Sequence, residues 1–202
     1  MTERKVALAS ALMLVSCSPG TEEKSKSANP SVGVVTYVVP ERVGSPPTPP
    51  VRSSAFTTLD MASCDLVEEN REEGSYWRRA CSAPPGWRVE WTESDLRQGL
   101  VVTSSAGNQT NLRLSELVAR GAFNSLGKTI EWRGKFASDP DALVVRMNVA
   151  NGRNGQGSDV SKLAVVRLTP KPCLIAVIDP AANQNVEARV IADSPDRSCI
   201  KD

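Results

Sequence analysis

The distribution of apolar residues after about residue 55 predicts a domain made mainly of strands. In Trp87-Arg88-Val89-Glu90-Trp91 every second residue is apolar. Trp87, Val89 and Trp91 are therefore expected on one side of a strand, facing the core. Further runs of strand-forming residues, several of them separated by turn residues, predict more strands. These runs are 64–70, 75–81, 100–103, 111–114, 129–132, 142–149, 162–168 and 173–179.

Two helices are expected among these strands. The segment 115–123 (SELVARGAF) predicts a short central helix with Ser115 as its N-cap. Asp179-Pro180 predicts the start of a C-terminal helix over 180–192, because Asp favours the N-cap and Pro the first helical position. The predicted fold class is therefore α+β: a mainly antiparallel β-sheet, a short central helix, and a C-terminal helix packed on one face.

The cysteines of this domain are expected to form two disulfides. They are Cys64, Cys81, Cys173 and Cys199. A hairpin with its turn at 71–74 pairs Asn70 with Ser75, and the same count places Cys64 opposite Cys81. Directly opposed residues on antiparallel strands have Cα atoms about 4.5–5.5 Å apart, a separation that a disulfide can span.

The second pair follows from the lengths of the last strand and helix. The strand from Cys173 rises about 20 Å, and the helix over 180–192 is about 20 Å long in the opposite direction. Cys199 then lies close enough to bond to Cys173. The alternatives are free thiols or a four-cysteine zinc site, but zinc ribbons carry C-x₂-C pairs, which this sequence lacks.

The first third of the chain has a different composition. Seven of the 14 prolines lie between residues 18 and 54, and such a segment cannot bury enough apolar surface to fold alone. The uncharged stretch 32–39 (VGVVTYVV) is an exception, and it is expected to dock as an edge strand on its own domain or on a partner. The predicted organisation is a signal peptide over 1–16, a Pro/Ser-rich tether over 17–54 and a disulfide-stapled domain over 55–202.

The N-terminus carries a targeting signal. Arg4 and Lys5 precede the apolar stretch 6–15, which is too short to span a bilayer. The following Leu14-Val15-Ser16-Cys17 resembles the lipobox of bacterial lipoprotein precursors. The resemblance implies cleavage before Cys17 and lipidation of Cys17, hence a lipid anchor in the cell envelope. Ser18 at the next position favours the outer membrane, facing the periplasm. The alternative is an ordinary secretory signal with a chance cysteine.

The domain itself bears one loose resemblance. Cys64, then Tyr76–Cys81, Gly86–Glu90 and Ser94–Gln98, resemble segments of small exported bacterial proteins of unknown function. That resemblance brings no activity with it. Disulfide-stapled β domains on lipid anchors are also the general plan of periplasmic lysozyme inhibitors, although the inhibitory loops of those proteins are not found in this sequence.

The amino-acid composition excludes several kinds of active site and ligand. The 24 Lys and Arg balance 23 Asp and Glu, which gives no reason to expect nucleic acid, and no His is present. Without His there are no Ser-His or Cys-His nucleophile pairs and no His-ligated metal. The string Ser125-Leu126-Gly127-Lys128 matches S-x-x-K, but Gly127 and the following TIEW oppose the helix that this motif needs. No catalytic residue, metal or cofactor is predicted.

The function expected is therefore that of a non-enzymatic, lipid-anchored binding module. Its partner is expected to be an envelope protein or a cell-wall fragment. The candidate partner-binding residues are Arg79 and Arg88 beside the loop 82–86, with the loop 151–158 as a second surface. The alternatives are a cell-wall-acting hydrolase and an inhibitor of a lytic enzyme. A deep cleft with converging carboxylates beside residues 90–95 would favour the hydrolase.

Overall fold

The computed structural model describes residues 51–72, 74–151, 157–194 and 196–201. The predicted signal peptide, Cys17, the segment 32–39 and most of the loop 151–158 lie outside the described residues. Neither of the two α-helices in the described part of the chain is long and apolar enough to cross a bilayer.

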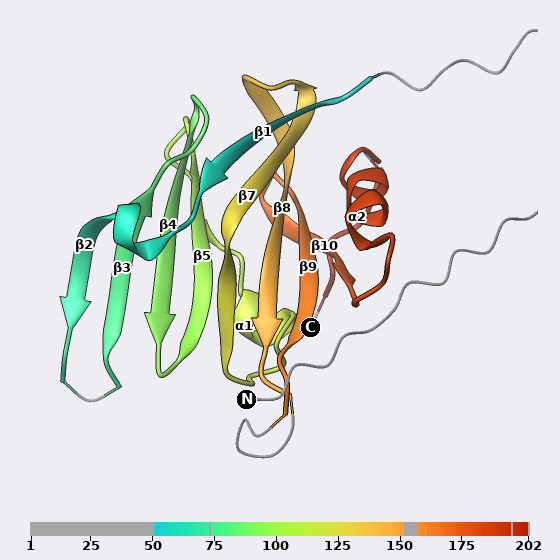
Figure 1. Ribbon diagram of the computed structural model, residues 1–202. Coiled ribbons are helices and arrows are strands. Elements are labelled where there is room, and N and C mark those ends of the chain that lie inside the picture. Colours follow the sequence, from blue (N-terminus) through green and yellow to red (C-terminus); the bar gives the residue numbers. More distant parts are fainter. Residues whose placement is uncertain (1–50, 73, 152–156, 195, 202) are drawn as a thin grey trace, which may run out of the picture. The chain divides into compact units, whose positions relative to one another are not determined.

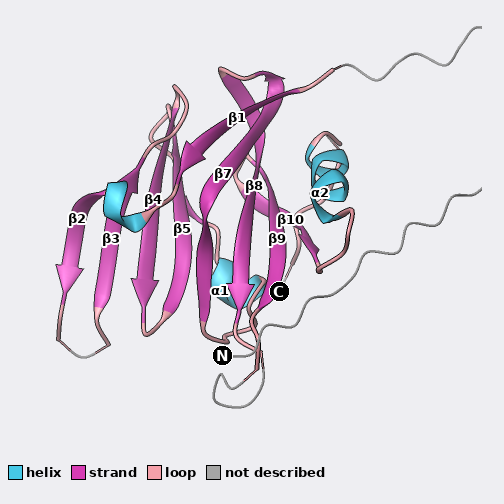
Figure 2. Ribbon diagram, in the orientation of Figure 1, coloured by secondary structure: helices cyan, strands magenta, loops and turns pink. Residues whose placement is uncertain are grey.

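One mixed sheet organises the domain, in the order β10-β9-β8-β7-β5-β4-β3-β2, with β1 paired to β7 and β6 paired to β5 (Figure 1). Its strands are β1 (Ser53–Thr58), β2 (Asp65–Asn70), β3 (Tyr76–Cys81), β4 (Trp87–Ser94), β5 (Arg97–Ser104), β6 (Gln109–Asn111), β7 (Asn124–Phe136), β8 (Asp139–Val149), β9 (Val160–Arg167) and β10 (Cys173–Ile178). The helices are the 3₁₀ turn η1 (Met61–Ser63), α1 (Leu114–Leu117) and α2 (Gln184–Ala192). All pairings are antiparallel except that of β5 with β7, so the predicted fold class is confirmed (Figure 2).

The two faces of the sheet carry separate cores. The larger core includes Trp91, Leu100, Trp132 and Met147, and it is covered by the segment that contains α1. The smaller core lies between α2 and strands β8, β9 and β10, as the ribbon also shows (Figure 1). Strands whose residues are buried on both faces read as continuous apolar runs, which explains the sequence of β8 and β9. The predicted packing of the C-terminal helix on one face is confirmed.

The first disulfide joins Cys64 and Cys81, as predicted, with their Cα atoms 4.5 Å apart. The register near the turn differs from the prediction, because Asn70 pairs with Tyr76 and not with Ser75. A β-bulge between Leu66 and Glu68 takes up the extra residue. Beyond the bulge Asp65 pairs with Ala80, and this restores the alignment on which the disulfide depends.

The second disulfide joins Cys173 and Cys199, also as predicted, but α2 begins later than expected. Its first residue is Gln184, and Asp179 does not cap it because its carboxylate pairs with Lys162 at 2.9 Å. The buried Gln184 amide donates to the carbonyl oxygens of Ser161 and Ile178 at 2.9 and 3.0 Å. These bonds hold the chain in turns before the helix starts, and the return to Cys173 is completed by a shorter helix.

The predicted central helix over 115–123 is wrong in length and in its cap. The helix α1 covers only Leu114–Leu117, and its N-cap position is Arg113 in the left-handed conformation. Ser115 accepts a hydrogen bond from the Asn124 amide at 3.3 Å and does not cap the helix. Arg120 and Gly121 both have positive φ, which ends helical geometry after barely one turn.

The sheet begins before residue 55, within the segment that the sequence assigned to the tether. β1 pairs with β7 from Ser53 onward, and Ser54 lies opposite Arg133. An ion-pair network at this point joins β1, β7, β8 and α2. Its members are Arg52, Ser54, Glu131, Arg133, Asp141, Arg189 and Asp193.

Candidate functional site

A cavity of about 730 Å³ opens at one end of the sheet, and we call it the Trp87 pocket. Its wall comes from four separate parts of the chain: the start of β4, the β5–β6 turn, the start of β8 and the connection that leads into β10. The lining residues are 85–87, 104–110, 139–140 and 168–172. A concave site built from loops at the end of a rigid sheet is the usual position for ligand binding.

Two glycine turns shape one side of this pocket. Gly86 has a φ of 83°, and the turn lets the Trp87 amide donate to the Pro84 carbonyl at 3.2 Å. Gly107 has a φ of 81°, and its amide donates to the Ser104 carbonyl at 2.9 Å in the β5–β6 turn. Trp87 and Ser104 are directly opposed on β4 and β5, so both turns are held at the same end of the sheet.

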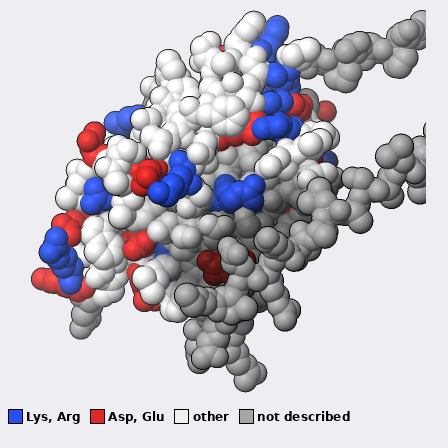
Figure 3. All heavy atoms as spheres, in the orientation of Figure 1, with Lys and Arg blue, Asp and Glu red and all other residues white. Residues whose placement is uncertain are grey.

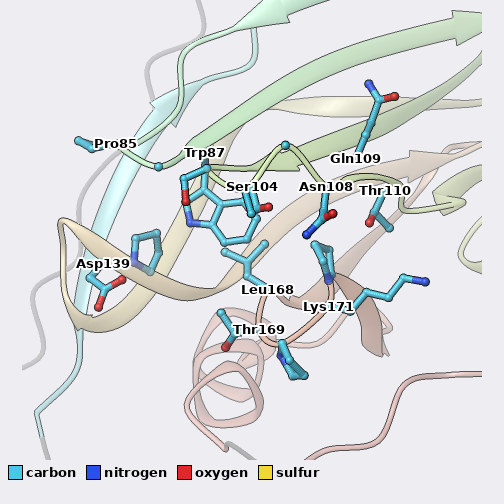
Figure 4. A pocket seen from close by; sticks show the side chains of 17 residues that line it. Pro85, Trp87, Ser104, Asn108, Gln109, Thr110, Asp139, Leu168, Thr169 and Lys171 are labelled. Carbon is cyan, nitrogen blue, oxygen red and sulfur yellow. The ribbon is translucent and has the colours of Figure 1, made fainter.

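The chemistry of the pocket centres on the Trp87 indole. Trp87 is half-buried, because it packs partly against the larger core and partly faces the cavity. Figure 4 shows its ring between Ser104 and Leu168, with the Asn108 side chain on the far side of Ser104. The Ser104 hydroxyl is buried and has no hydrogen-bond partner among the described residues. An aromatic face with nearby hydroxyl and amide groups suits a ligand that presents both apolar and polar surface.

The sequence missed this pocket, although parts of its signal were visible. The alternation over 87–91 predicts Trp87 in the core together with Val89 and Trp91. Val89 and Trp91 are indeed only 1% and 3% exposed. The turn residues at 84–86, 106–108 and 169–172 mark loops at strand ends, where binding residues collect. Which of these loops meet depends on the strand order, and the sequence does not give that order.

The structure does not bring Arg79 and Arg88 together. Arg79 lies opposite Trp91 and therefore faces the same side of the sheet as the larger core, whereas Arg88 precedes Val89 and faces the other side. Arg79 donates to the Cys64 carbonyl at 3.3 Å, beside the first disulfide. Arg88 is exposed and lines a small hollow next to Gly86 and Trp87. Only Arg88 is thus placed near the Trp87 pocket, so the single patch predicted from the sequence is not formed.

The candidate carboxylates each contact a positive or amide group. Glu90 forms an ion pair with Arg78 at 3.5 Å, and Glu93 accepts a hydrogen bond from the Gln98 amide at 2.7 Å. Asp95 pairs with Arg97 beside a hollow of about 440 Å³ that Glu93 also lines. Glu90 lies on the opposite side of β4 from Glu93, so these three carboxylates do not converge on one point.

Glu69 on β2 is an acidic residue whose pKa is shifted by its neighbours. Hydrogen bonds from the Arg71 guanidinium at 2.6 Å and the Trp77 indole at 3.0 Å lower the pKa of this carboxyl below its usual value. The same carboxylate raises the pKa of Arg71. The group is therefore an ionised, hydrogen-bonded carboxylate at neutral pH, which stabilises the β2–β3 hairpin.

The S-x-x-K residues lie on a strand. Ser125 and Lys128 both belong to β7, where Ser125 is paired with Asn148, and Lys128 contacts Asp60 at 3.2 Å. They do not share one turn of a helix, the arrangement that the motif needs. Within the described ranges, no group of three or more Cys, Asp or Glu side chains is placed to hold a metal ion.

Comparison with known proteins adds no further assignment. No family model, curated protein or solved structure matches this chain. The role of the protein is therefore argued from its own residues.

Proposed function

We propose that this protein is a non-enzymatic binding module of the bacterial cell envelope, anchored by a lipid on Cys17 and binding its ligand in the Trp87 pocket. The observation that carries the proposal is the pocket itself. A half-buried indole, several prolines and mainly neutral polar side chains form one concave surface at the end of a rigid sheet, with Asp139 and Lys171 as its charged residues.

The composition of the pocket favours recognition over turnover. Its uncharged hydrogen-bonding groups, among them Ser104, Asn108 and Thr110, can orient a ligand without exchanging protons with it near neutral pH. A glycosidase would need a pair of carboxylates, whereas the described lining of the pocket has one, Asp139, and Glu90 and Glu93 are on opposite sides of their strand. These features support a binding role over the alternative of a cell-wall hydrolase.

The N-terminal sequence supports the location. The lipobox at 14–17 predicts a lipid anchor, and the proline-rich segment up to about residue 50 predicts a spacer between the membrane and the domain. Two disulfides are typical of an oxidising compartment outside the cytoplasm. A tethered binding domain facing the periplasm would meet the cell wall, and we therefore name peptidoglycan as the first ligand to test.

The proposal is tested by co-sedimentation of the full-length protein, in mild detergent, with purified peptidoglycan. We expect binding that Trp87→Ala weakens at least fivefold and that Asn108→Trp, which fills the pocket without removing a buried side chain, also weakens. Phe56→Ala is the matched control, because Phe56 is an aromatic residue of 59% exposure on β1 that does not line the pocket.

The same samples distinguish binding from catalysis. Release of new reducing ends or soluble fragments from the peptidoglycan would contradict the non-enzymatic role and favour the hydrolase. Binding that persists unchanged in both pocket variants would show that the Trp87 pocket is not the site.

A further inference from the structure

A second cavity of about 460 Å³ adjoins the Trp87 pocket, and we call it the basic groove. The two cavities share Thr110, Lys171 and Pro172, so they form one continuous surface. The basic side chains of the groove are Arg113, Arg167, Lys171 and Lys201, and its described lining residues include no Asp or Glu. The groove therefore differs from the face seen in Figure 3, where basic and acidic side chains lie close together.

Arg167 is the central cation of this groove. One of its terminal nitrogens donates to the Arg197 carbonyl at 2.9 Å, and the other contacts the sulfurs of Cys173 and Cys199 at 3.6 and 3.4 Å. Its Nε is buried without a partner, and no carboxylate of the described residues pairs with it. A half-buried guanidinium is normally paired with an acid, so the Arg167 charge is available to attract an anion.

Other arginines of the fold show the usual pattern. Arg52, Arg78, Arg133 and Arg189 each contact at least one carboxylate. Arg79 resembles Arg167, because its Nε is also buried without a partner and no carboxylate of the described residues pairs with it, but it lines a hollow that contains Glu69 and Glu93. Arg167 differs in lining a groove whose described residues include no Asp or Glu. The second disulfide holds the Arg167 guanidinium in this position, because both of its sulfurs contact that group.

Lys171 connects the groove to the pocket. It is exposed, it lines both cavities, and no ion pair with it is found among the described residues. Figure 4 shows its side chain extending from the side of the pocket away from Trp87. An anionic group held by Arg167 and Lys171 would therefore leave the uncharged remainder of the same ligand beside the indole.

We propose that the basic groove binds the carboxylate or phosphate of an acidic saccharide, and that an adjacent sugar ring of that ligand lies against Trp87. This inference rests on the proposed function, because it names the chemical class of the ligand for the same site. Guanidinium and ammonium groups bind carboxylate and phosphate oxygens through charge-assisted hydrogen bonds. The indole and the polar side chains of the Trp87 pocket suit a ring with apolar and hydroxyl-bearing surfaces.

The test uses pairs of saccharides in which one member is acidic and the other carries the same sugar without the charge. Binding of the full-length protein in mild detergent is measured by calorimetry with tetragalacturonate and with its fully methyl-esterified form. Glucose 6-phosphate and glucose provide the corresponding pair for a phosphate source. We expect the acidic member of at least one pair to bind about tenfold more tightly than its neutral partner. That preference is expected to fall as salt is raised.

Two lysine substitutions locate the anion. Lys171→Gln is expected to weaken binding of the acidic probe about fivefold to tenfold and to weaken binding of the neutral probe much less. Lys135→Gln is the matched control, because Lys135 is an exposed lysine on β7 that lines neither cavity. Both lysines are exposed, and unchanged thermal unfolding of each variant is required before their affinities are compared.

The following results would overturn the inference, and each can be distinguished from a failure of the proposed function. Equal affinity for acidic and neutral probes, or an unchanged affinity in Lys171→Gln, would overturn the anion site and leave the Trp87 pocket as a neutral binding site. An equal loss of affinity for the acidic probe in Lys135→Gln would show that the effect comes from the overall charge of the protein. That result would also overturn the anion site. If no probe binds while peptidoglycan binding through Trp87 persists, the saccharide class is wrong and the proposed function stands.

Discussion

Removal of the Asp193 carboxylate is the perturbation that most directly tests how α2 is held on the sheet. Asp193 accepts hydrogen bonds from Arg52 Nε at 3.1 Å and from Arg133 Nε at 3.0 Å, and it has a further contact with the Arg133 guanidinium. The Arg133 side chain is only 10% exposed, whereas that of Asp193 is 27% exposed. In Asp193→Ala the buried cation loses its main counter-ion.

The magnitude follows from what remains around Arg133. Removing one partner of a buried ion pair costs about 3–5 kcal/mol, because the other charge is left uncompensated. Here Ser54 still accepts from Arg133 at 2.6 Å, and Glu131 lies 3.6 Å away. These contacts and the partial exposure of Asp193 reduce the cost. We therefore expect the free energy of unfolding to fall by about 2–3 kcal/mol.

The assay is urea unfolding of the full-length protein in detergent, followed by tryptophan fluorescence. With an m-value of about 2–3 kcal/mol/M for a domain of this size, the midpoint should fall by roughly 1 M. Asp196→Ala is the control, since Asp196 is exposed and no contact of its carboxylate with the described residues is found; it should change the free energy by less than about 0.5 kcal/mol. A loss below about 1 kcal/mol in Asp193→Ala would refute the reasoning. The double variant Arg133→Met with Asp193→Leu should cost less than the sum of its single substitutions, because the buried pair is replaced as a unit.

Three further results are expected. Cys17→Ala should leave the protein without an acyl mass on its N-terminal peptide and no longer stably membrane-bound; a wild-type peptide without acyl mass would contradict the lipoprotein interpretation. Replacing Cys173 and Cys199 with Ser should lower the free energy of unfolding by about 3.5 kcal/mol, the chain-entropy value for the separation of 26 residues, and peptide mapping of the wild type should recover this bond. The lowered pKa of Glu69 stabilises the fold above its unfolded pKa, and this contribution is lost as the pH falls through the folded value. Thermal unfolding of the wild type should therefore decline more steeply from pH 5 to pH 3 than that of Glu69→Gln, and parallel declines would show that the Arg71 contact has no effect.

The sequence by itself determined the features that depend on local periodicity and chain length. Strict alternation placed Val89 and Trp91 in the core, and it placed Arg88 on the outer side of the same strand. The first disulfide can be predicted by counting residues across one hairpin. The predicted alignment of Cys64 with Cys81 is correct because the β-bulge between Leu66 and Glu68 takes up one extra residue.

The tertiary structure decided everything that depends on which distant segments meet. The parallel contact of Arg97 with Asn124 places β5 beside β7, and β1 pairs with β7 from Ser53, two residues before the predicted start of the domain. The side on which Arg79 lies depends on its register with Trp91 and not on its own neighbours in sequence. Helix starts also moved, because Asn124 binds Ser115 and Lys162 pairs with Asp179, both from outside the helices concerned.

The candidate site depends wholly on which distant segments the tertiary structure brings together. Trp87, the β5–β6 turn and the segment 168–172 are each visible in the sequence as an aromatic residue or as turn residues. Local propensity determines whether each segment forms a strand or a turn. The order of the strands determines which of these segments line the same pocket. The charge of Arg167 is likewise visible in the sequence, and only the folded chain leaves it without an acidic partner, because the described residues that line the groove include no Asp or Glu.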